Sequence, residues 1–527
     1  MQHESLVEYG PRRVIITITA IFCALLEIVD TTIVNVALND MKGNLGATLN
    51  EIGWVITAYA IGNVIIVPMT SWLSAQFGRR NYFAASIIIF TVFSFLCGNA
   101  NGIWELVFFR FMQGLGGGAL LVTSQTIITE SYPPEKRGMA QAIYGLGVII
   151  GPTLGPPLGG YIVAHHSWPF IFYINIPIGI IATLLTLQFV KSPKYAEKKS
   201  RKEVDWAGIG LLAVSVGSLQ YVLERGQEDD WFASKTITTL TITAVMGFFF
   251  FVWRELTAKN PIVELRVLKN GNLAVGTVLS FILGFGLYGS TFIIPLYTQS
   301  TLGWTAQQAG ALMIPAALTT AFMMPIIGQM LQRGVKQQYL VALGMFIFFL
   351  YSLWGYKIIT PDTSKDDFFW MLIFRGFGLG MLFIPITTLS LSTLKGQQIG
   401  QGAAFTGMMR QLGGSFGVAL ITTFMATQNV VHKNDLNSHM SYDNPVVQQR
   451  VHGMQHNYMM TKGMTTDEAL RAAYQTLDRI VTKQAAVLSY MDVFLYLGIL
   501  FLICIPFMLM VKGNKQPKKA DLAEGMH

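Results

Sequence analysis

The sequence predicts an all-α integral membrane protein made of two similar six-helix bundles, with two further membrane helices inserted between them. The composition, the number of apolar segments and an internal repeat lead to this fold class. Of the 527 residues, 52% are hydrophobic and only 13% are charged, whereas soluble domains carry about a quarter charged residues. This composition excludes an ordinary soluble enzyme and favours a chain that crosses a membrane many times.

Apolar segments of about 20 residues, long enough to cross a bilayer, recur about fourteen times along the chain. In order, they cover 14–38, 52–74, 82–99, 103–127, 138–163, 169–190, 205–223, 236–254, 272–298, 306–331, 338–357, 367–392, 401–428 and 486–511. The first follows Arg12 and Arg13 and has no small-residue cleavage site. We therefore interpret it as a span and not as a signal peptide.

Lysine and arginine residues gather in the loops on one side of these spans, for example at Arg79–Arg80 and from Lys191 to Lys202. Because positively charged short loops remain in the cytoplasm, we expect this side and both termini to be cytoplasmic. The net charge of +8 therefore reflects membrane topology and does not indicate a nucleic-acid partner. The three cysteines lie within apolar runs, so neither a disulfide framework nor a metal site is expected.

An internal repeat relates the two halves of the chain. QGLGGGAL at 113–120 recurs as RGFGLGML at 375–382, and the same offset carries Gly151 and Gly155 onto Gly413 and Gly417. Parallel repeats of this kind place a substrate cavity at the interface between the bundles. The predicted division is an N-terminal bundle (1–190), two inserted helices with their flanking cytoplasmic loops (191–271), a C-terminal bundle (272–511) with a long outer loop (429–485), and a cytoplasmic tail (512–527).

Three charged residues are expected inside the membrane in the first bundle. Glu27 and Asp30 share one face of the first span, and Arg110 enters the fourth span from the other side to a similar depth. Ionisable residues within a bilayer pair with one another or line a cavity. We interpret Asp30, with Glu27, as a proton-binding group tuned by Arg110. The alternative is a permanent ion pair that holds the two spans together.

The fifth span carries a glycine stripe interrupted by prolines, GLGVIIGPTLGPPLGG at 145–160. Glycines at every fourth residue form a smooth face that a neighbouring helix can approach closely, and prolines favour a bend. We expect a tightly packed, kinked helix that acts as a hinge or as a seal at the bundle interface. The residues assigned to this seal are Gly151, Gly155, Pro156, Gly159 and Gly160.

Several polar and aromatic residues within the spans are candidates for lining the substrate cavity, although each is equally expected as an ordinary contact between helices. They are Asn35, Tyr59, Gln113, Thr123, Gln125, Phe292, Tyr297 and Arg410.

The long outer loop contains four of the eight histidines, but their irregular spacing does not indicate a metal site. Within it, 465–483 is expected to form an amphipathic helix, favoured as a solvated cap over a docking surface for an accessory protein. No phosphate-binding loop of the GxxxxGK[ST] type and no nucleophile elbow occurs. We therefore expect neither an enzyme nor a cofactor.

Four ordered motifs resemble those of the major facilitator superfamily, and within it the fourteen-span drug:proton antiporters of the EmrB-like branch. They are DTTIVNVAL at 30–38, LVFFRFMQGLG at 106–116, GPTLGPPLGG at 151–160 and WPFIFYINIPIG at 168–179. The third is the antiporter motif, and the second contains the arginine to which the family assigns proton coupling. The loop SWLSAQFGRR at 71–80 departs from the family by placing Ala75 where an aspartate is usual. The charge relay built on that aspartate cannot operate here in the usual form.

The resemblance implies a proton-driven exporter of lipophilic or amphipathic drugs in a bacterial inner membrane, working by alternating access among membrane lipids. It also implies a periplasmic adaptor protein and an outer-membrane channel as possible partners. Two alternatives remain open. One is a dedicated exporter of a metabolite, lipid or siderophore, and the other is a membrane sensor or scaffold that does not transport.

Overall fold

All regular elements in the described part of the chain are helices, as the composition predicts. The computed structural model describes residues 6–193, 204–441 and 443–510. A bilayer offers no hydrogen-bond partners to the backbone, so an apolar chain satisfies its peptide groups within helices. The all-α membrane class is therefore confirmed.

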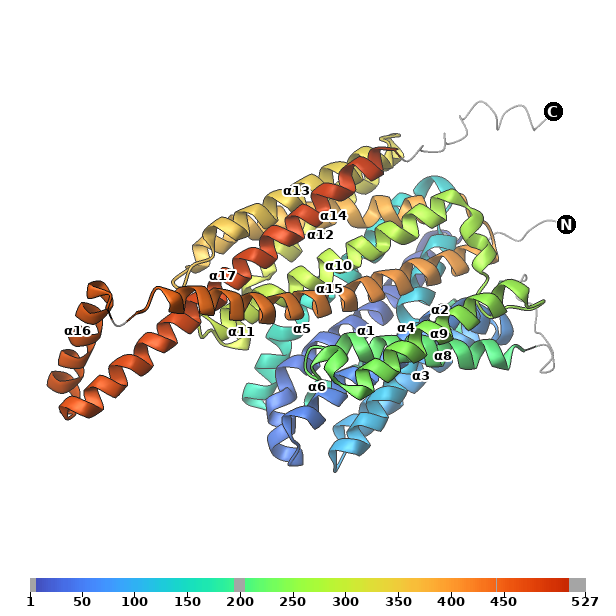
Figure 1. Cartoon of the computed structure of the whole chain (residues 1–527). Coiled ribbons are helices and arrows are strands. Elements are labelled where there is room, and N and C mark those ends of the chain that lie inside the picture. The colour runs from blue at the N-terminus through green and yellow to red at the C-terminus, as the bar shows by residue number, and fades with distance from the viewer. Residues whose placement is uncertain (1–5, 194–203, 442, 511–527) are drawn as a thin grey trace, which may run out of the picture.

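The first group of helices forms one flank of the molecule, drawn in blue to teal in Figure 1. These helices pack mainly against one another, with α2 against α4, α1 against α5 and α3 against both α4 and α7. The bounds are α1 (Gly10–Leu45), α2 (Leu49–Phe77), α3 (Arg79–Gly98), α4 (Ile103–Ser131), α5 (Arg137–His165), α6 (Phe170–Tyr173) and α7 (Asn175–Phe189).

Two helices, α8 (Trp206–Arg225) and α9 (Lys235–Thr257), follow as a hairpin on the side of the molecule. The hairpin contacts both halves of the protein. The Gln220 amide of α8 donates a hydrogen bond to Ser415 Oγ (2.9 Å), and the nearby Trp231 indole donates to Thr423 Oγ1 (3.0 Å). On the other side, Arg225 donates to the backbone oxygen of Asn50 at the start of α2.

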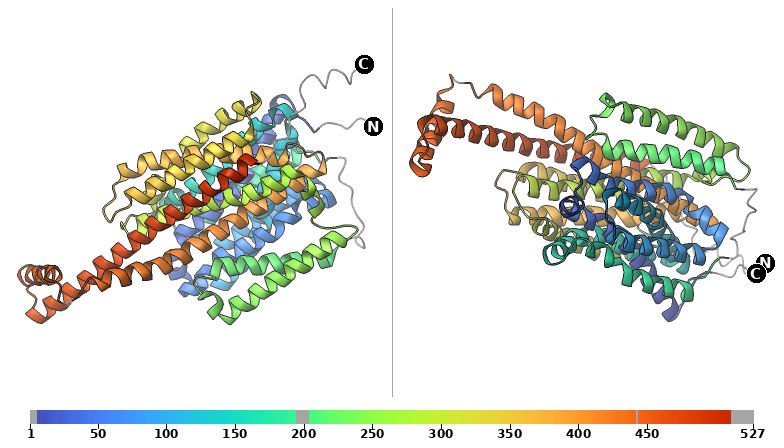
Figure 2. Two further views of the ribbon diagram at one scale, coloured as in Figure 1. Left: turned by 45° about the horizontal axis from the view of Figure 1, so that its top comes forward. Right: turned by 90° about the horizontal axis from the view of Figure 1, so that it is seen from below.

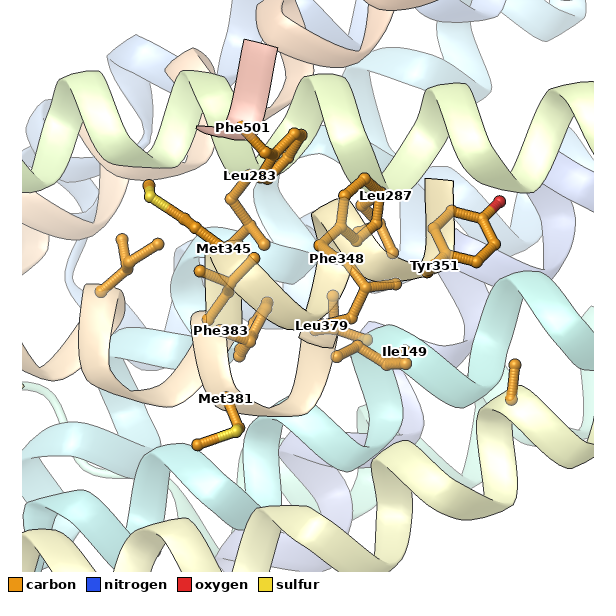
Figure 3. Close-up of a cluster of buried hydrophobic side chains, with 14 of the residues drawn as sticks. Ile149, Leu283, Leu287, Met345, Phe348, Tyr351, Leu379, Met381, Phe383 and Phe501 are labelled. Carbon is orange, nitrogen blue, oxygen red and sulfur yellow. The ribbon is translucent and has the colours of Figure 1, made fainter. Parts of the chain in front are cut away.

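The second group contains the remaining helices, drawn in yellow-green to red in Figure 1. Their bounds are α10 (Gly271–Ser300), α11 (Ala306–Leu312), α12 (Ile314–Gln332), α13 (Gln337–Ile358), α14 (Lys365–Leu391), α15 (Gln397–Ser438), α16 (Pro445–Lys462) and α17 (Thr466–Met510). A large apolar core joins α10, α13, α14 and α17, and residues of α5 extend it into the first group. Figure 3 shows part of this core, with Ile149 of α5 beside Leu379 and Phe348.

The sequence repeat has a local structural counterpart at the start of the second helix in each group. Gly46 and Gly303 both adopt a positive φ, 63° and 72°, which glycine tolerates without strain. Thr48 caps α2 in a capping box with Glu51, and Thr305 caps α11 in the same way with Gln308. The same short motif therefore ends one helix and begins the next in both halves.

The number of spans agrees with the sequence except at one helix. Twelve described helices are long and apolar enough to cross a membrane, and α5, bent by 40° between Pro152 and Leu154, is a thirteenth. The remaining candidate, α15, is more polar, and it packs against α2, α4, α10 and α17. A shielded helix can carry polar residues such as Arg410. The total of fourteen stays a prediction.

The outer segment between the last two predicted spans, 429–485, is more helical than expected and forms an arm that projects from the bundle (Figure 1). The amphipathic helix expected at 465–483 corresponds to the start of α17. The arm consists of the end of α15, all of α16 and the start of α17, which continues directly into the last span. Within the arm, Lys433 pairs with Asp478 (3.1 Å), and Thr465 caps α17 through Glu468. Helices α15 and α17 therefore continue beyond their apolar runs, and these polar contacts lie within the extended part.

Candidate proton-coupling site and bundle interface

Asp30 of α1 lies at the centre of a buried polar network in the first group. Its side chain is fully buried (0% exposed). Oδ2 accepts a hydrogen bond from Nη1 of Arg110 at 2.6 Å. Oδ1 accepts from the side-chain amides of Gln113 (3.0 Å) and Asn175 (2.8 Å). Helices α1, α4 and α7 thus converge on one carboxylate.

Arg110 of α4 is held by more than its ion pair. The guanidinium is 1% exposed, donates from Nη1 to Gln113 Oε1 (2.7 Å) and from Nε to the backbone oxygen of Val55 (3.2 Å). Its carbon lies 4.1 Å from the centroid of the Tyr59 ring, within cation–π range. Several donors are therefore satisfied at once, as a buried guanidinium requires.

A second layer orients the groups that contact Asp30. Ser94 Oγ of α3 accepts from both Gln113 (3.1 Å) and Asn175 (3.0 Å), and donates to the backbone oxygen of Phe172 (2.9 Å). Neither Asn175, which contacts Asp30, nor Ser94, which holds Gln113 and Asn175, is among the site residues predicted from the sequence. Asn175 lies in the motif at 168–179, and that motif could have pointed to it. Ser94 lies in none of the quoted motifs, so no sequence signal could have found it.

Glu27 does not join this network directly. It is 5% exposed, and its Oε1 accepts a hydrogen bond from the Asn63 amide of α2 (2.8 Å). Asp30 and Glu27 interact only through electrostatic repulsion, with no hydrogen bond between them. The three charges expected as one cluster thus form an Asp30–Arg110 contact pair and a separate Glu27 site on the same helix.

The charge on Asp30 decides which hydrogen bonds its side chain can make. An ionised Asp30 accepts all three hydrogen bonds, whereas a protonated carboxyl loses its charge attraction to Arg110 and gains one donor. Breaking a buried pair leaves an uncompensated charge and is strongly unfavourable. Binding a proton to Asp30 would therefore require Arg110 and its neighbours to rearrange.

The glycine stripe of α5 packs on α1, within the first group. A Cβ on Gly155 would overlap the Thr32 hydroxyl, and one on Gly151 would lie 2.6 Å from Ile28. Gly159 faces Ile33 in the same way. The stripe thus holds α5 against the helix that carries Glu27 and Asp30.

A different edge of α5 faces the second group. Gly160 lies close to Gln307, with 3.6 Å from its ideal Cβ position to the Gln307 Cβ, and Gly310 approaches the ring of Pro157. The expectation that the whole stripe lies at the bundle interface is therefore wrong for Gly151, Gly155 and Gly159. Side chains at these positions would meet α1, because the four-residue spacing keeps them on a single face of the helix.

The candidate cavity residues fall into three sets. Tyr59, Thr123, Gln125 and Arg410 are buried and each has an atom without a hydrogen-bond partner. Gln113 belongs to the Asp30 network. The remaining three are elsewhere: Asn35 is exposed on α1, Phe292 is partly buried against the apolar core, and Tyr297 donates to Thr363 at the end of the second group near the arm.

The loop between α2 and α3 has an ion pair despite its missing aspartate. Arg79, the first residue of α3, donates to the Glu130 carboxylate at the end of α4 from both terminal guanidinium nitrogens, Nη1 to Oε2 and Nη2 to Oε1 (3.1 Å), and both side chains are buried. The start of α3 is thus tied to the end of α4.

The described residues contain no group of three or more His, Cys, Asp or Glu side chains arranged to hold a metal ion. In the arm, His432 instead contacts Asp492 (2.7 Å).

Two groups of membrane helices that meet along α5 and α15, with a carboxylate–guanidinium pair buried in one of them, form the architecture of a secondary transporter. The chain belongs to the major facilitator superfamily, whose family model matches residues 20–418.

Among curated proteins it is similar to two bacterial resistance proteins over almost its whole length. FarB of Neisseria gonorrhoeae, a fatty acid resistance protein, is 34% identical over 500 residues, covering 94% of this chain and 96% of FarB. The multidrug export protein EmrB of Escherichia coli K12 is 32% identical over 504 residues, covering 95% and 96%. The resemblance to EmrB-like transporters drawn from the motifs is therefore confirmed.

The fold is also similar to that of solved transporters. The proton:xylose symporter XylE superimposes with a TM-score of 0.56 at 15% identity, covering 94% of this chain and 96% of XylE. At that identity the likeness concerns the fold alone.

Proposed function

We propose that this protein is a proton-coupled antiporter that exports lipophilic or amphipathic drugs by alternating access. The observation that carries the proposal is the Asp30–Arg110 pair, fully enclosed by helices at membrane depth and joined to neutral hydrogen-bonding groups. Such a carboxylate is the kind of group that can exchange a proton during a transport cycle. Two similar proteins are named a multidrug export protein and a fatty acid resistance protein, and these names support the export of apolar compounds.

The proposal includes the domain division and the topology. We assign residues 1–190 and 272–511 as the two moving bundles, 191–271 as the insertion and 512–527 as a tail. The distribution of Lys and Arg supports a bacterial inner-membrane location with both termini in the cytoplasm. In this orientation the arm extends into the periplasm, where an adaptor protein that leads to an outer-membrane channel would bind.

The test is transport by purified protein in liposomes with an imposed pH gradient and a lipophilic dye as probe. Wild-type protein is expected to accumulate or expel the dye in response to the gradient, and Asp30→Asn is expected to abolish the response. Asp435→Asn, an exposed acid in the arm, is the matched control and should behave as wild type. Unchanged gradient-driven transport by Asp30→Asn would remove Asp30 from the coupling role.

A dedicated exporter of a lipid, metabolite or siderophore is the second candidate, and the name of the relative FarB favours the lipid case. A deletion strain separates the two: hypersensitivity to several unrelated drugs supports multidrug export, and sensitivity to fatty acids alone supports the dedicated exporter. A sensor or scaffold would give no flux in the liposome assay.

A further inference from the structure

The hairpin of α8 and α9 touches both bundles through one helix. Helix α8 packs against α2 of the first bundle and against α15 of the second. Polar contacts to both helices gather at the C-terminal end of α8 and in the following turn, 226–234, which the proposed topology places on the outer side. If the two bundles move relative to one another, α8 cannot keep both sets of contacts. One set must therefore break and re-form in each transport cycle.

The contact of α8 with α2 combines packed rings with a buried cation. The ring of Tyr221 lies 5.2 Å from that of Trp54, centroid to centroid. Arg225 is 4% exposed, pairs with Glu228 at 2.7 Å and donates to the backbone oxygen of Asn50 at 3.3 Å. Removing a buried guanidinium from its partners is strongly unfavourable. We therefore expect α8 to stay with α2 when the bundles move.

The outer contact of the hairpin with α15 consists of two neutral hydrogen bonds. The side-chain amide of Gln220, which is 1% exposed, donates to Ser415 Oγ at 2.9 Å. The indole of Trp231 donates to Thr423 Oγ1 at 3.0 Å. Nearer the inner side the three helices share an apolar cluster, whose contacts are not directional. Hydrogen bonds need short distances and good alignment, so a displacement of α15 breaks these two first.

The turn at 226–234 holds the Trp231 ring in place for this contact. Asp230 and Trp231 both have a positive φ, 56° and 47°, which is disfavoured for residues other than glycine. The indole also donates to Gln227 Oε1 (3.2 Å), and its ring packs on the backbone of Gly226, where an ideal Cβ would lie 2.6 Å from it. Local contacts thus fix the ring in the position from which it reaches α15.

We propose that Gln220 and Trp231 are positioning residues for alternating access: their hydrogen bonds to Ser415 and Thr423 form a latch that holds α15 against α8 and α2 on the outer side. When the outer ends separate, the latch breaks while Arg225 keeps α8 on α2. This inference rests on the alternating-access part of the proposed function and gives the inserted hairpin a role in it.

The test measures the distance between the hairpin and α15 in the purified protein. Spin labels are attached at Lys235→Cys, at the start of α9, and at Ala426→Cys in α15. Both positions are exposed, and the three native cysteines are replaced beforehand. With and without a transported dye, the otherwise unchanged protein is expected to show a short distance for the latched conformation and a longer one for the open conformation.

Trp231→Phe keeps an aromatic ring but removes the donor of the latch. The ratio of open to latched protein is expected to rise about fivefold, the effect of one neutral hydrogen bond. A role in folding alone would lower the yield and leave this ratio unchanged. Trp253→Phe is the matched control, because Trp253 is an exposed tryptophan of the same hairpin. Its ratio should remain within about twofold of that of the unchanged protein.

Thr423→Val removes the acceptor from the other side and keeps the inference testable if Trp231→Phe perturbs folding. It too is expected to raise the ratio about fivefold. Because Trp231 also donates to Gln227, a double-mutant cycle is needed to isolate the bond to α15. The double variant should show about the same ratio as either single variant, since each removes the same hydrogen bond.

An unchanged ratio in Trp231→Phe would overturn the latch, and so would single effects that multiply in the double variant. A single distance in the unchanged protein, both with and without dye, would instead contradict alternating access and with it the proposed function. The two failures are therefore distinguishable, and neither measurement needs a pH gradient.

Discussion

At the scale of single residues, the buried charges divide into two sites that the sequence does not separate. Asp30 and Arg110 are in contact, as their equal depths suggest, and Asn175 and Ser94 complete the network. Depth is predictable because each helical residue advances about 1.5 Å. The hydrogen-bond partners of Asp30 are not predictable in this way, because a lone serine or asparagine in an apolar span does not indicate which helix it faces.

The fork of the Arg110 guanidinium, and not its charge alone, should be required for transport. Arg110→Lys keeps the positive charge but cannot bind Asp30, Gln113 and the Val55 carbonyl together. We expect gradient-driven transport to fall at least about tenfold, because hydrogen bonds to charged groups contribute about 1.5–3 kcal/mol each. Liposome flux measures the effect, and membrane yield controls for folding. Wild-type flux in this variant would show that a simple charge suffices.

At the scale of helices, α5 and the arm show where apolarity predicts structure and where it does not. The spacing of glycines in α5 predicts a close contact but not its partner, and α1 occupies that position. The apolar runs of α15 and α17 likewise predict two membrane spans, but they do not show that both helices continue past the apolar part. That part of the helices is polar and contains contacts such as Lys433–Asp478 and Thr465–Glu468.

The contact between α5 and α1 should be sensitive to side-chain volume at Gly155. Gly155→Leu is expected to leave protein in the membrane and abolish drug efflux, because its side chain would overlap Thr32. The smaller change Gly155→Ala should be partly rescued by Thr32→Ala, as measured by drug resistance and liposome flux. Gly210→Ala in α8, where no atom lies within 4 Å of the added Cβ, is the control. Full resistance in Gly155→Leu would refute the importance of this packing.

The arm should be separable from the transport machinery. Lys433 Nζ lies 3.1 Å from Asp478 Oδ1, so these two side chains meet where α15 and α17 enter the arm, and the test replaces residues 434–477 by a short Gly/Ser turn. We expect the shortened protein to retain gradient-driven transport in liposomes, because the bundle contacts lie outside the deleted segment. In cells, resistance should fall if the arm binds an adaptor protein. Undiminished resistance would argue against that partner.

At the scale of the whole molecule, the composition, the apolar segments and the repeat predict the two-bundle fold. Local structure at Gly46 and Gly303 reflects the repeat directly. The faces that the bundles present to each other are less predictable, because residues on both sides of a packed interface have the same apolar composition. Only the structure distinguishes the α5 edge at Gly160, which meets α11, from the stripe that meets α1.

The contact between α5 and α11 should open during transport if the bundles move relative to one another. Gly160→Cys with Gln307→Cys, in a background without Cys23, Cys97 and Cys504, places two sulfurs at a site where the Cβ separation of 3.6 Å suits a disulfide. Oxidation is expected to stop dye transport and reduction to restore it. Either single cysteine variant is the control, and full transport by the oxidised double variant would contradict movement at this contact.

Proton release on substrate binding tests the central claim most directly. Purified protein in weakly buffered detergent solution is mixed with a transported dye, and the pH change is followed with an indicator. The proposed mechanism predicts that wild-type protein releases protons when the dye binds, and that Asp30→Asn binds dye with most of this release lost. Equal proton release from wild type and Asp30→Asn would contradict the assignment of proton coupling to Asp30.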